Sequence, residues 1–161
     1  MSGVSGGRGG VSQDDGATLV TANQKTSYAA GTVYTVTNTA AAIDFGTTDP
    51  AITIDSPGTY LILARARFEN VGATFAASRL LTLKLRRTNN TAADLTGGTS
   101  LYNTPIITTL TSSLTELTIQ AVYTTTNSDD IIALFTLIGT VPSAGSLTVD
   151  EASIIAYRLQ Q

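Results

Sequence analysis

The stretch SPGTYLILARARFEN, residues 56–70, decides how this sequence is interpreted, because it alternates like a β-strand yet carries apolar side chains on both sides. Successive side chains of a strand point to opposite faces of the sheet. One face is apolar throughout and consists of Tyr60, Ile62, Ala64, Ala66 and Phe68. The other face begins with leucines and ends with charges, in the order Leu61, Leu63, Arg65, Arg67 and Glu69. A strand with one side in water does not place leucines there, so we expect something to cover Leu61 and Leu63.

From about residue 28 onward the sequence predicts short strands separated by turns, and no segment has a helical period. Strands are predicted at 31–38, 52–54, 80–87, 131–139 and 151–161, whereas Asn, Gly and Ser predict a loop over 89–100. Two more strands are predicted within 104–126, separated near Ser112 and Ser113. In LLTLKLRR, the leucines Leu81, Leu83 and Leu85 share one face. IIALFTLIG is apolar on both faces, which predicts burial on both. Many short strands without helices favour a sandwich or jelly roll.

The composition argues against catalysis and against nucleic-acid binding. The 161 residues include no Cys and no His, only 13% are charged, and the net charge is -3. The usual general base, thiolate ligand and basic stripe are therefore missing. Two acidic pairs, Asp129–Asp130 and Asp150–Glu151, sit at predicted turns, where neighbouring side chains point apart. Turn chemistry explains these pairs, with a Ca²⁺ site as the alternative, so we expect no enzyme, metal or cofactor.

The Gly- and Ser-rich beginning of the chain is set apart as residues 1–27, followed by one domain over 28–161. This segment is either a disordered tail or an arm that orders against a partner. On the second interpretation, the candidate attachment residues are Val4, Arg8 and Val11. The start of the sequence lacks the apolar core of a signal peptide, and no apolar run has the length of a membrane helix. We therefore expect synthesis in the cytoplasm without export by the general route, and no membrane partner.

Four segments in this order resemble the globular head of complement component one-q and tumour-necrosis-factor-like domains. They are IDSPGTYLILARARF, LLTLKLRRTNN, TTTNSDDIIALFTL and ASIIAYRL. The resemblance implies an antiparallel jelly roll of about ten strands in two sheets that forms a homotrimer. It also implies that the sheet holding 56–70, LTIQAVY and the last strand faces the three-fold axis. Leu61, Leu63, Arg65, Arg67, Ile154 and Tyr157 are then the expected trimer interface.

The two arginines of this stretch have two interpretations. They form either a solvated strand end or a pair of cations near the trimer seam, bound to Glu69 or to a carboxylate of the next subunit.

The resemblance leads to a virion structural protein as the expected function, and specifically to a trimeric capsid decoration protein (cement or head-fibre) of a bacteriophage. The N-terminal arm would attach it to the major capsid protein or to another virion protein. The alternative is a tail-fibre module that binds a receptor or a carbohydrate such as a host-surface glycan. Tyr102 and Asn103 are the candidate contacts for that alternative.

Overall fold

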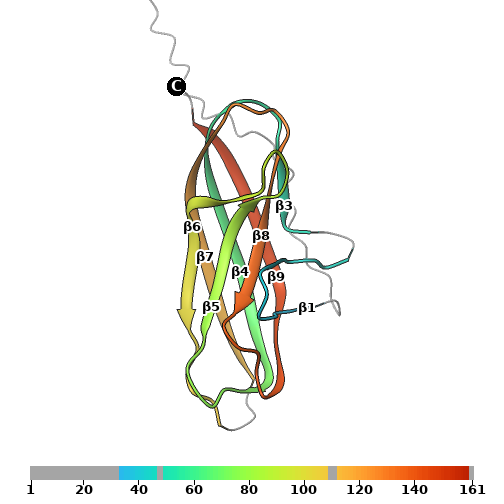
Figure 1. The fold of residues 1–161 in the computed structure, drawn as a ribbon, viewed down its shortest axis with the longest axis vertical. Helices are drawn as coiled ribbons and strands as arrows, with labels where there is room; N and C mark the ends of the chain where they lie inside the picture. Colours follow the sequence, from blue (N-terminus) through green and yellow to red (C-terminus); the bar gives the residue numbers. More distant parts are fainter. Residues whose placement is uncertain (1–32, 47–48, 109–111, 160–161) are drawn as a thin grey trace, which may run out of the picture.

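Two antiparallel β-sheets packed face to face form the fold (Figure 1). The computed structural model describes residues 33–46, 49–108 and 112–159, which form nine strands and no helix. The strands are β1 (Tyr34–Thr35), β2 (Ala41–Ala42), β3 (Ala51–Ile54), β4 (Gly58–Thr74), β5 (Leu80–Arg87), β6 (Ala93–Asn103), β7 (Ser113–Thr125), β8 (Asp130–Ile138) and β9 (Ala144–Leu159). The first sheet has the order β1-β9-β4-β7; the second has the order β2-β8-β5-β6, with β3 also paired to β8. The predicted all-β jelly-roll sandwich is confirmed.

Residues 58–70 of the stretch SPGTYLILARARFEN lie in β4, in the interior of the first sheet between β7 and β9. Its predicted inward face is buried, since Tyr60, Ile62 and Ala66 are all 0% exposed. The resemblance implied that this strand, LTIQAVY and the last strand share one sheet, and the pairing of β4 with β7 and β9 confirms it. The opposite side of β4 is therefore an outer surface of the sandwich.

The core lies between the sheets and is filled by the alternate residues that the sequence predicted. Leu81, Leu83 and Leu85 of β5 are 0–1% exposed. They face inward-pointing residues of β7 such as Leu117 and Ile119, which are also buried. Period-two alternation thus sets which side of each strand meets the core.

The predicted loop over residues 89–100 is wrong for most of its length, because Ala93–Asn103 is the edge strand β6. Its glycines mark an irregularity in pairing rather than a loop. The register against β5 shifts between Lys84 and Arg86, where Gly97 has a φ of +73°. Gly98 is needed for a close approach, since an added Cβ would lie 3.0 Å from the Cβ of Leu95. Glycine inside a strand often marks such a bulge or close contact.

Two further strand predictions are wrong in extent. The first of the two strands predicted within 104–126 contributes a single bridge in its described part, between Ile107 and Phe75. The strand predicted at 31–38 shortens in its described part to β1. At the other end of the chain, β9 begins at Ala144, well before the predicted start.

Strand β8 was predicted to be buried on both faces, and the structure confirms this fully for the inward face only. Ile132 and Leu134 are 0% exposed, whereas Ile131 on the outer face is 37% exposed. The guanidinium of Arg86 lies over the ring of Phe135, 5.5 Å from its centroid, and covers part of that outer face. The resemblance placed this strand in the sheet opposite β4, which is where it lies.

The proposed arm at residues 1–27, with Val4, Arg8 and Val11, lies outside the described residues. No helix in the described part of the chain is long and apolar enough to cross a membrane.

Candidate functional site

The outer face of the β1-β9-β4-β7 sheet is the candidate functional site, because one half of it is apolar and the described residues leave part of that half exposed. Leu61 of β4 pairs with Val122 of β7 on one side and Tyr157 of β9 on the other. Leu63, two residues further along β4, pairs with Ile155. Val122 is 59% exposed, and the others are half-buried. Residues from three strands therefore form one continuous apolar patch, which we call the apolar half.

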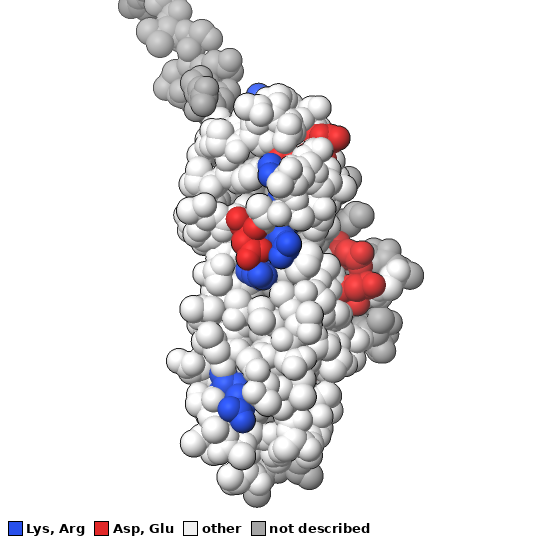
Figure 2. Space-filling model, in the orientation of Figure 1, with Lys and Arg blue, Asp and Glu red and all other residues white. Residues whose placement is uncertain are grey.

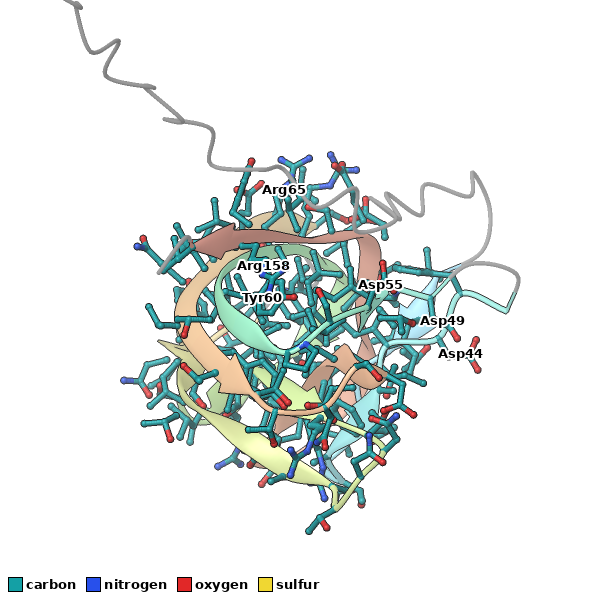
Figure 3. The ribbon with its side chains drawn as sticks, turned by 90° about the horizontal axis from the view of Figure 1, so that it is seen from above. Asp44, Asp49, Asp55, Tyr60, Arg65 and Arg158 are labelled. Atoms are coloured by element: carbon teal, nitrogen blue, oxygen red, sulfur yellow. The ribbon has the colours of Figure 1, made fainter. Side chains whose placement is uncertain are left out.

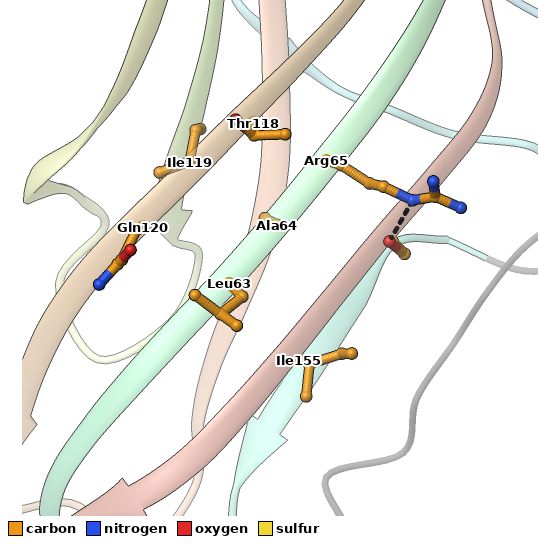
Figure 4. Close-up of a pocket in the computed structure, with 8 residues that line it drawn as sticks. Leu63, Ala64, Arg65, Thr118, Ile119, Gln120 and Ile155 are labelled. Atoms are coloured by element: carbon orange, nitrogen blue, oxygen red, sulfur yellow. Dashed lines mark hydrogen bonds between the residues drawn. The ribbon is translucent and has the colours of Figure 1, made fainter.

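A shallow hollow of about 440 Å³ lies on this face and overlaps the apolar half (Figure 4). Leu63, Gln120 and Ile155 form part of its wall, and Arg65 borders it. Arg65 Nε donates a hydrogen bond of 3.4 Å to the hydroxyl of Ser153 across the strands. A concave apolar surface edged by polar groups is suited to receive a protruding side chain from a partner.

Charges occupy the face next to the apolar half and form what we call the charged half. Arg67 donates from Nη2 to Oδ2 of Asp150 at 2.7 Å and from Nε to Oδ1 at 3.0 Å, a two-pronged contact. Arg65 forms an ion pair with Glu151 and approaches Oε2 of Glu116 at 3.5 Å. Figure 3 shows Arg65 pointing away from the sandwich, whereas Tyr60 of the same strand points into it.

A β-bulge in β9 explains why two neighbouring acidic residues both face these arginines. Arg67 pairs with Glu151, but the next residue, Phe68, pairs with Val149, so Asp150 is the extra residue. A bulge interrupts the alternation of side chains. The expectation that Asp150 and Glu151 sit at a turn and point apart is therefore wrong, since both lie within β9 and contact Arg67.

Five of the six predicted interface residues lie together on the outer face of the sheet, and the sixth, Ile154, lies in the core. Leu61, Leu63, Arg65, Arg67 and Tyr157 all lie on the outer face of the sheet.

Ile154 does not belong to this face, because it is 0% exposed and packs in the core. Residues 154 and 157 are an odd number of positions apart and so face opposite sides of a strand. Ile155 takes the place of Ile154 on the outer face.

The ion-pair partners of Arg65 within the chain differ from the predicted one. Glu69 was the predicted intrachain partner, but the ion pairs of Arg65 go to Glu116 of β7 and Glu151 of β9. Glu116 lies opposite Arg67 in the register, so alternation in β7 could have identified it once the strand pairing was known. The strand pairing itself depends on the tertiary structure.

A buried carboxylate at the beginning of β8 is the second notable site. Asp130 is 0% exposed and accepts hydrogen bonds of 2.5 Å from the hydroxyls of Tyr123 and Thr125. Its other oxygen accepts bonds of 3.1 Å from the side-chain amides of Asn90 and Asn127. Burial by itself raises the pKa of Asp130, but these four hydrogen bonds outweigh it and lower the pKa to about 2. Burial, together with the bond donated to Asp130, raises the pKa of Tyr123.

The acidic pairs do not combine into a metal site in the part of the chain that the structure describes. There, no three His, Cys, Asp or Glu side chains come together in a way that could hold a metal ion. Asp130 is engaged by hydrogen-bond donors, and Asp150 by Arg67. The alternative Ca²⁺ site thus has no supporting geometry among the described residues.

The residues considered for receptor binding lie in a strand rather than a loop. Tyr102 and Asn103 end β6, and Tyr102 packs against the core. Packing therefore accounts for Tyr102.

Comparisons with known proteins support the fold and identify no family. No protein-family model matches the sequence, and no curated protein is significantly similar to it. Among solved structures, the chain is similar to Eiger TNF from S. frugiperda, with a TM-score of 0.51 and 12% sequence identity. The similarity covers 80% of this chain and 90% of that one. The chain therefore has a tumour-necrosis-factor-like jelly-roll fold.

Proposed function

We propose that the protein is a non-enzymatic structural module that forms a homotrimer through the outer face of the β1-β9-β4-β7 sheet. The apolar half carries this proposal: Leu61, Leu63, Ile155 and Tyr157 lie together with Val122, which is 59% exposed, on one side of the sandwich. Contiguous exposed apolar surface of this kind typically marks an interaction site. The tumour-necrosis-factor-like fold favours a second and third copy of the chain as the occupants.

The energetics favour an association through this half over one through the charged half. Fully burying a Leu contributes roughly 1.5–3 kcal/mol, and Leu61 and Leu63 already have most of their surface buried, so each would add up to about 1 kcal/mol on association. Arg65 and Arg67 already have carboxylate partners in their own chain. The arginines would then lie where the interface meets water, where exposed ion pairs contribute less than about 1 kcal/mol each.

The larger assembly that we propose is a bacteriophage virion, with the chain as a capsid decoration protein of the cement or head-fibre type. The N-terminal segment 1–27 would attach it to the major capsid protein or another virion protein through Val4, Arg8 and Val11. Support comes from the Gly-rich segment ahead of a compact β-domain and from the scarcity of charge in the sequence. The step from fold to this role is an analogy. A receptor-binding tail-fibre module is the alternative, although the packing of Tyr102 does not favour its predicted contact.

Replacement of two leucines tests the proposed trimer. We expect the full-length protein to have three times the chain mass by light scattering at micromolar concentration. The double variant Leu61→Ser, Leu63→Ser should have the mass of one chain and retain the far-ultraviolet circular dichroism of a β-protein. The matched control is Leu80→Ser, Leu101→Ser, which changes two leucines that are 44% and 59% exposed elsewhere on the surface. A wild-type protein with the mass of one chain, or a trimeric Leu61/Leu63 variant, would contradict this interface.

Deletion of residues 2–17 tests the attachment. We expect the shortened chain to keep the thermal unfolding midpoint of the intact protein but to lose co-sedimentation with virus particles. Retained co-sedimentation would show that the arm is not the attachment segment.

A further inference from the structure

A pocket of about 250 Å³ lies between strands β6 and β7, the neighbouring edge strands of the two sheets. It shares no lining residue with the hollow on the outer face of the first sheet, although Val122 of the apolar half also lines it. Its lining includes Arg87, Asp94, Leu95, Thr96, Tyr123 and Thr124. The pocket is smaller than the 300–1,000 Å³ typical of drug-sized ligands, so it suits a ligand with one ring.

Arg87 supplies the cation of this pocket. It follows Leu83 and Leu85 in the inward alternation of β5, which directs its side chain between the sheets. Its Nε donates to the carbonyl oxygen of Thr91 at 3.0 Å, and its Nη1 donates to the hydroxyl of Tyr123 at 3.3 Å. Its Nη2 makes no hydrogen bond with any described residue. The guanidinium thus keeps donor capacity for a ligand.

The buried Asp130 holds this part of the wall in place. Its carboxylate accepts the hydrogen bond of Tyr123 at 2.5 Å and lies 3.8 Å from Nη1 of Arg87. A surface turn does not require a fully buried carboxylate, but a preorganised binding wall benefits from one. The ring of Tyr123 and the guanidinium of Arg87 are therefore fixed before any ligand arrives.

The charges around the pocket favour an anionic ligand. Asp94 already pairs with Lys84 at 2.8 Å and with Arg86 at 3.5 Å. Both of these cations project from the outer face of the second sheet and neutralise Asp94 there, so Arg87 is the lining residue whose guanidinium keeps donor capacity for an anion. Figure 2 shows a mixed cluster of charges near the middle of the outer face of the second sheet, with a separate basic patch below it and acidic patches at its right edge. Attraction for an anion is thus local rather than spread over this face.

We propose that this pocket binds a carboxylate-bearing sugar ring, such as a uronic or sialic acid. The guanidinium of Arg87 would bind the carboxylate, because its planar donors match that geometry. The partly exposed ring of Tyr123 offers apolar surface to the sugar ring, and the hydroxyl of Thr96 is available to its hydroxyls. This inference goes beyond the structural role proposed above and does not depend on the trimer.

Titration of the full-length protein with three sugars, followed by amide NMR, tests the proposal. N-acetylneuraminic acid and glucuronic acid are the charged probes, and galactose is the neutral one. We expect at least one acid to shift amides of Arg87, Thr96 and Tyr123 with an affinity at least about tenfold above that of galactose. Equal shifts by galactose would overturn the role of the carboxylate, and no shift at tens of millimolar of any sugar would overturn the site.

Two variants and a control complete this test. Arg87→Lys keeps the charge but loses the planar fork and should weaken binding of the acid about tenfold to a hundredfold. Thr96→Trp fills the mouth of the pocket without touching Asp130 and should abolish binding. Thr99→Trp, on an exposed residue of the same strand outside the pocket lining, should bind like the wild type. Unchanged binding by Thr96→Trp would overturn the proposal, and the solution mass of each variant shows whether trimer formation is affected separately.

Discussion

Replacing the buried Asp130 by Asn should destabilise the protein by about 2–3 kcal/mol at neutral pH. The carboxylate is fully buried and accepts four hydrogen bonds from the side chains of Tyr123, Thr125, Asn90 and Asn127. Asn has nearly the same shape, so the change removes the charge without leaving a cavity. It also places an amide N–H₂ where the wild type has an acceptor for two hydroxyl donors. We therefore expect a folded but weakened variant.

The magnitude follows from the pKa of the carboxyl group. The hydrogen bonds outweigh the opposing effect of burial and lower the pKa of Asp130 from its usual 3.8 to about 2. One pKa unit corresponds to about 1.36 kcal/mol, so the charged form is favoured by about 2.5 kcal/mol more in the folded protein than in the unfolded chain. Mutational data on hydrogen bonds to charged groups give effects of the same order. A typical total stability is about 5–15 kcal/mol, so the effect should be readily measurable.

The same carboxylate makes stability depend on pH in a defined window. Because the pKa is lower in the folded state, this stabilisation is fully present above the unfolded pKa of about 4. It is lost as the pH falls through the folded pKa of about 2. Asn does not titrate, so the variant should lack this part of the pH dependence. The gap in stability between wild type and variant should therefore narrow from pH 4 towards pH 2.

Urea unfolding at fixed protein concentration, followed by tyrosine fluorescence at pH 7, 5, 4, 3 and 2, measures this gap. Fixed concentration matters because association of the chains would shift the apparent stability. Other carboxylates titrate in both proteins, and their contribution cancels in the difference. A gap below about 1 kcal/mol at pH 7, or one that stays constant down to pH 2, would contradict the assigned role of Asp130.

Two backbone positions give further predictions. Thr91 has a φ of +77°, which is costly for a β-branched residue. The variant Thr91→Gly should therefore raise the free energy of unfolding by up to about 1 kcal/mol. A lower free energy of unfolding in the same urea assay would contradict this prediction. Gly145 has a φ of +66°, and an added Cβ would lie 2.2 Å from the backbone oxygen of Gly72. Gly145→Ala should therefore destabilise the protein by several kcal/mol. Gly46→Ala is the control: no atom lies within 4 Å of its new Cβ, so it should cost only about 1 kcal/mol. Equal melting temperatures for the two variants would refute the steric argument.

The two halves of the outer face differ in what a partner could gain from them. The apolar half has surface, such as Val122 at 59% exposure, that the described residues leave in water. The charged half is already linked by contacts between strands, such as the 2.7 Å contact from Arg67 to Asp150. Separating these charges from their own chain would cost desolvation that a new ion pair repays poorly. We therefore expect the charged half to set where the interface ends and the apolar half to supply most of its energy.

The sequence alone determined which side of most strands faces the core. Alternation identified Tyr60 and Ile62 in β4, and Leu83 in β5, as buried residues. It also identified Leu61 and Leu63 as apolar residues on the wrong side of a strand. These results follow from a local rule, because side chains on a strand alternate whatever the strand pairs with. The same rule, applied consistently to the last strand, would have selected Ile155 rather than Ile154.

The tertiary structure decided everything that depends on which strands are neighbours. Alternation cannot reveal that Val122 and Tyr157 flank Leu61, since that contact depends on the pairing of β4 with β7 and β9. It also cannot reveal the bulge that turns Asp150 and Glu151 to the same face, because a bulge breaks the alternation on which the prediction depends. In the sequence Asp130 looks like an ordinary turn residue, because one of the side chains that donates a hydrogen bond to it, Asn90, comes from a loop that is distant along the chain. Local side-chain direction was thus encoded locally, whereas the apolar half, the charged half and the buried carboxylate arise from contacts between segments far apart in the chain.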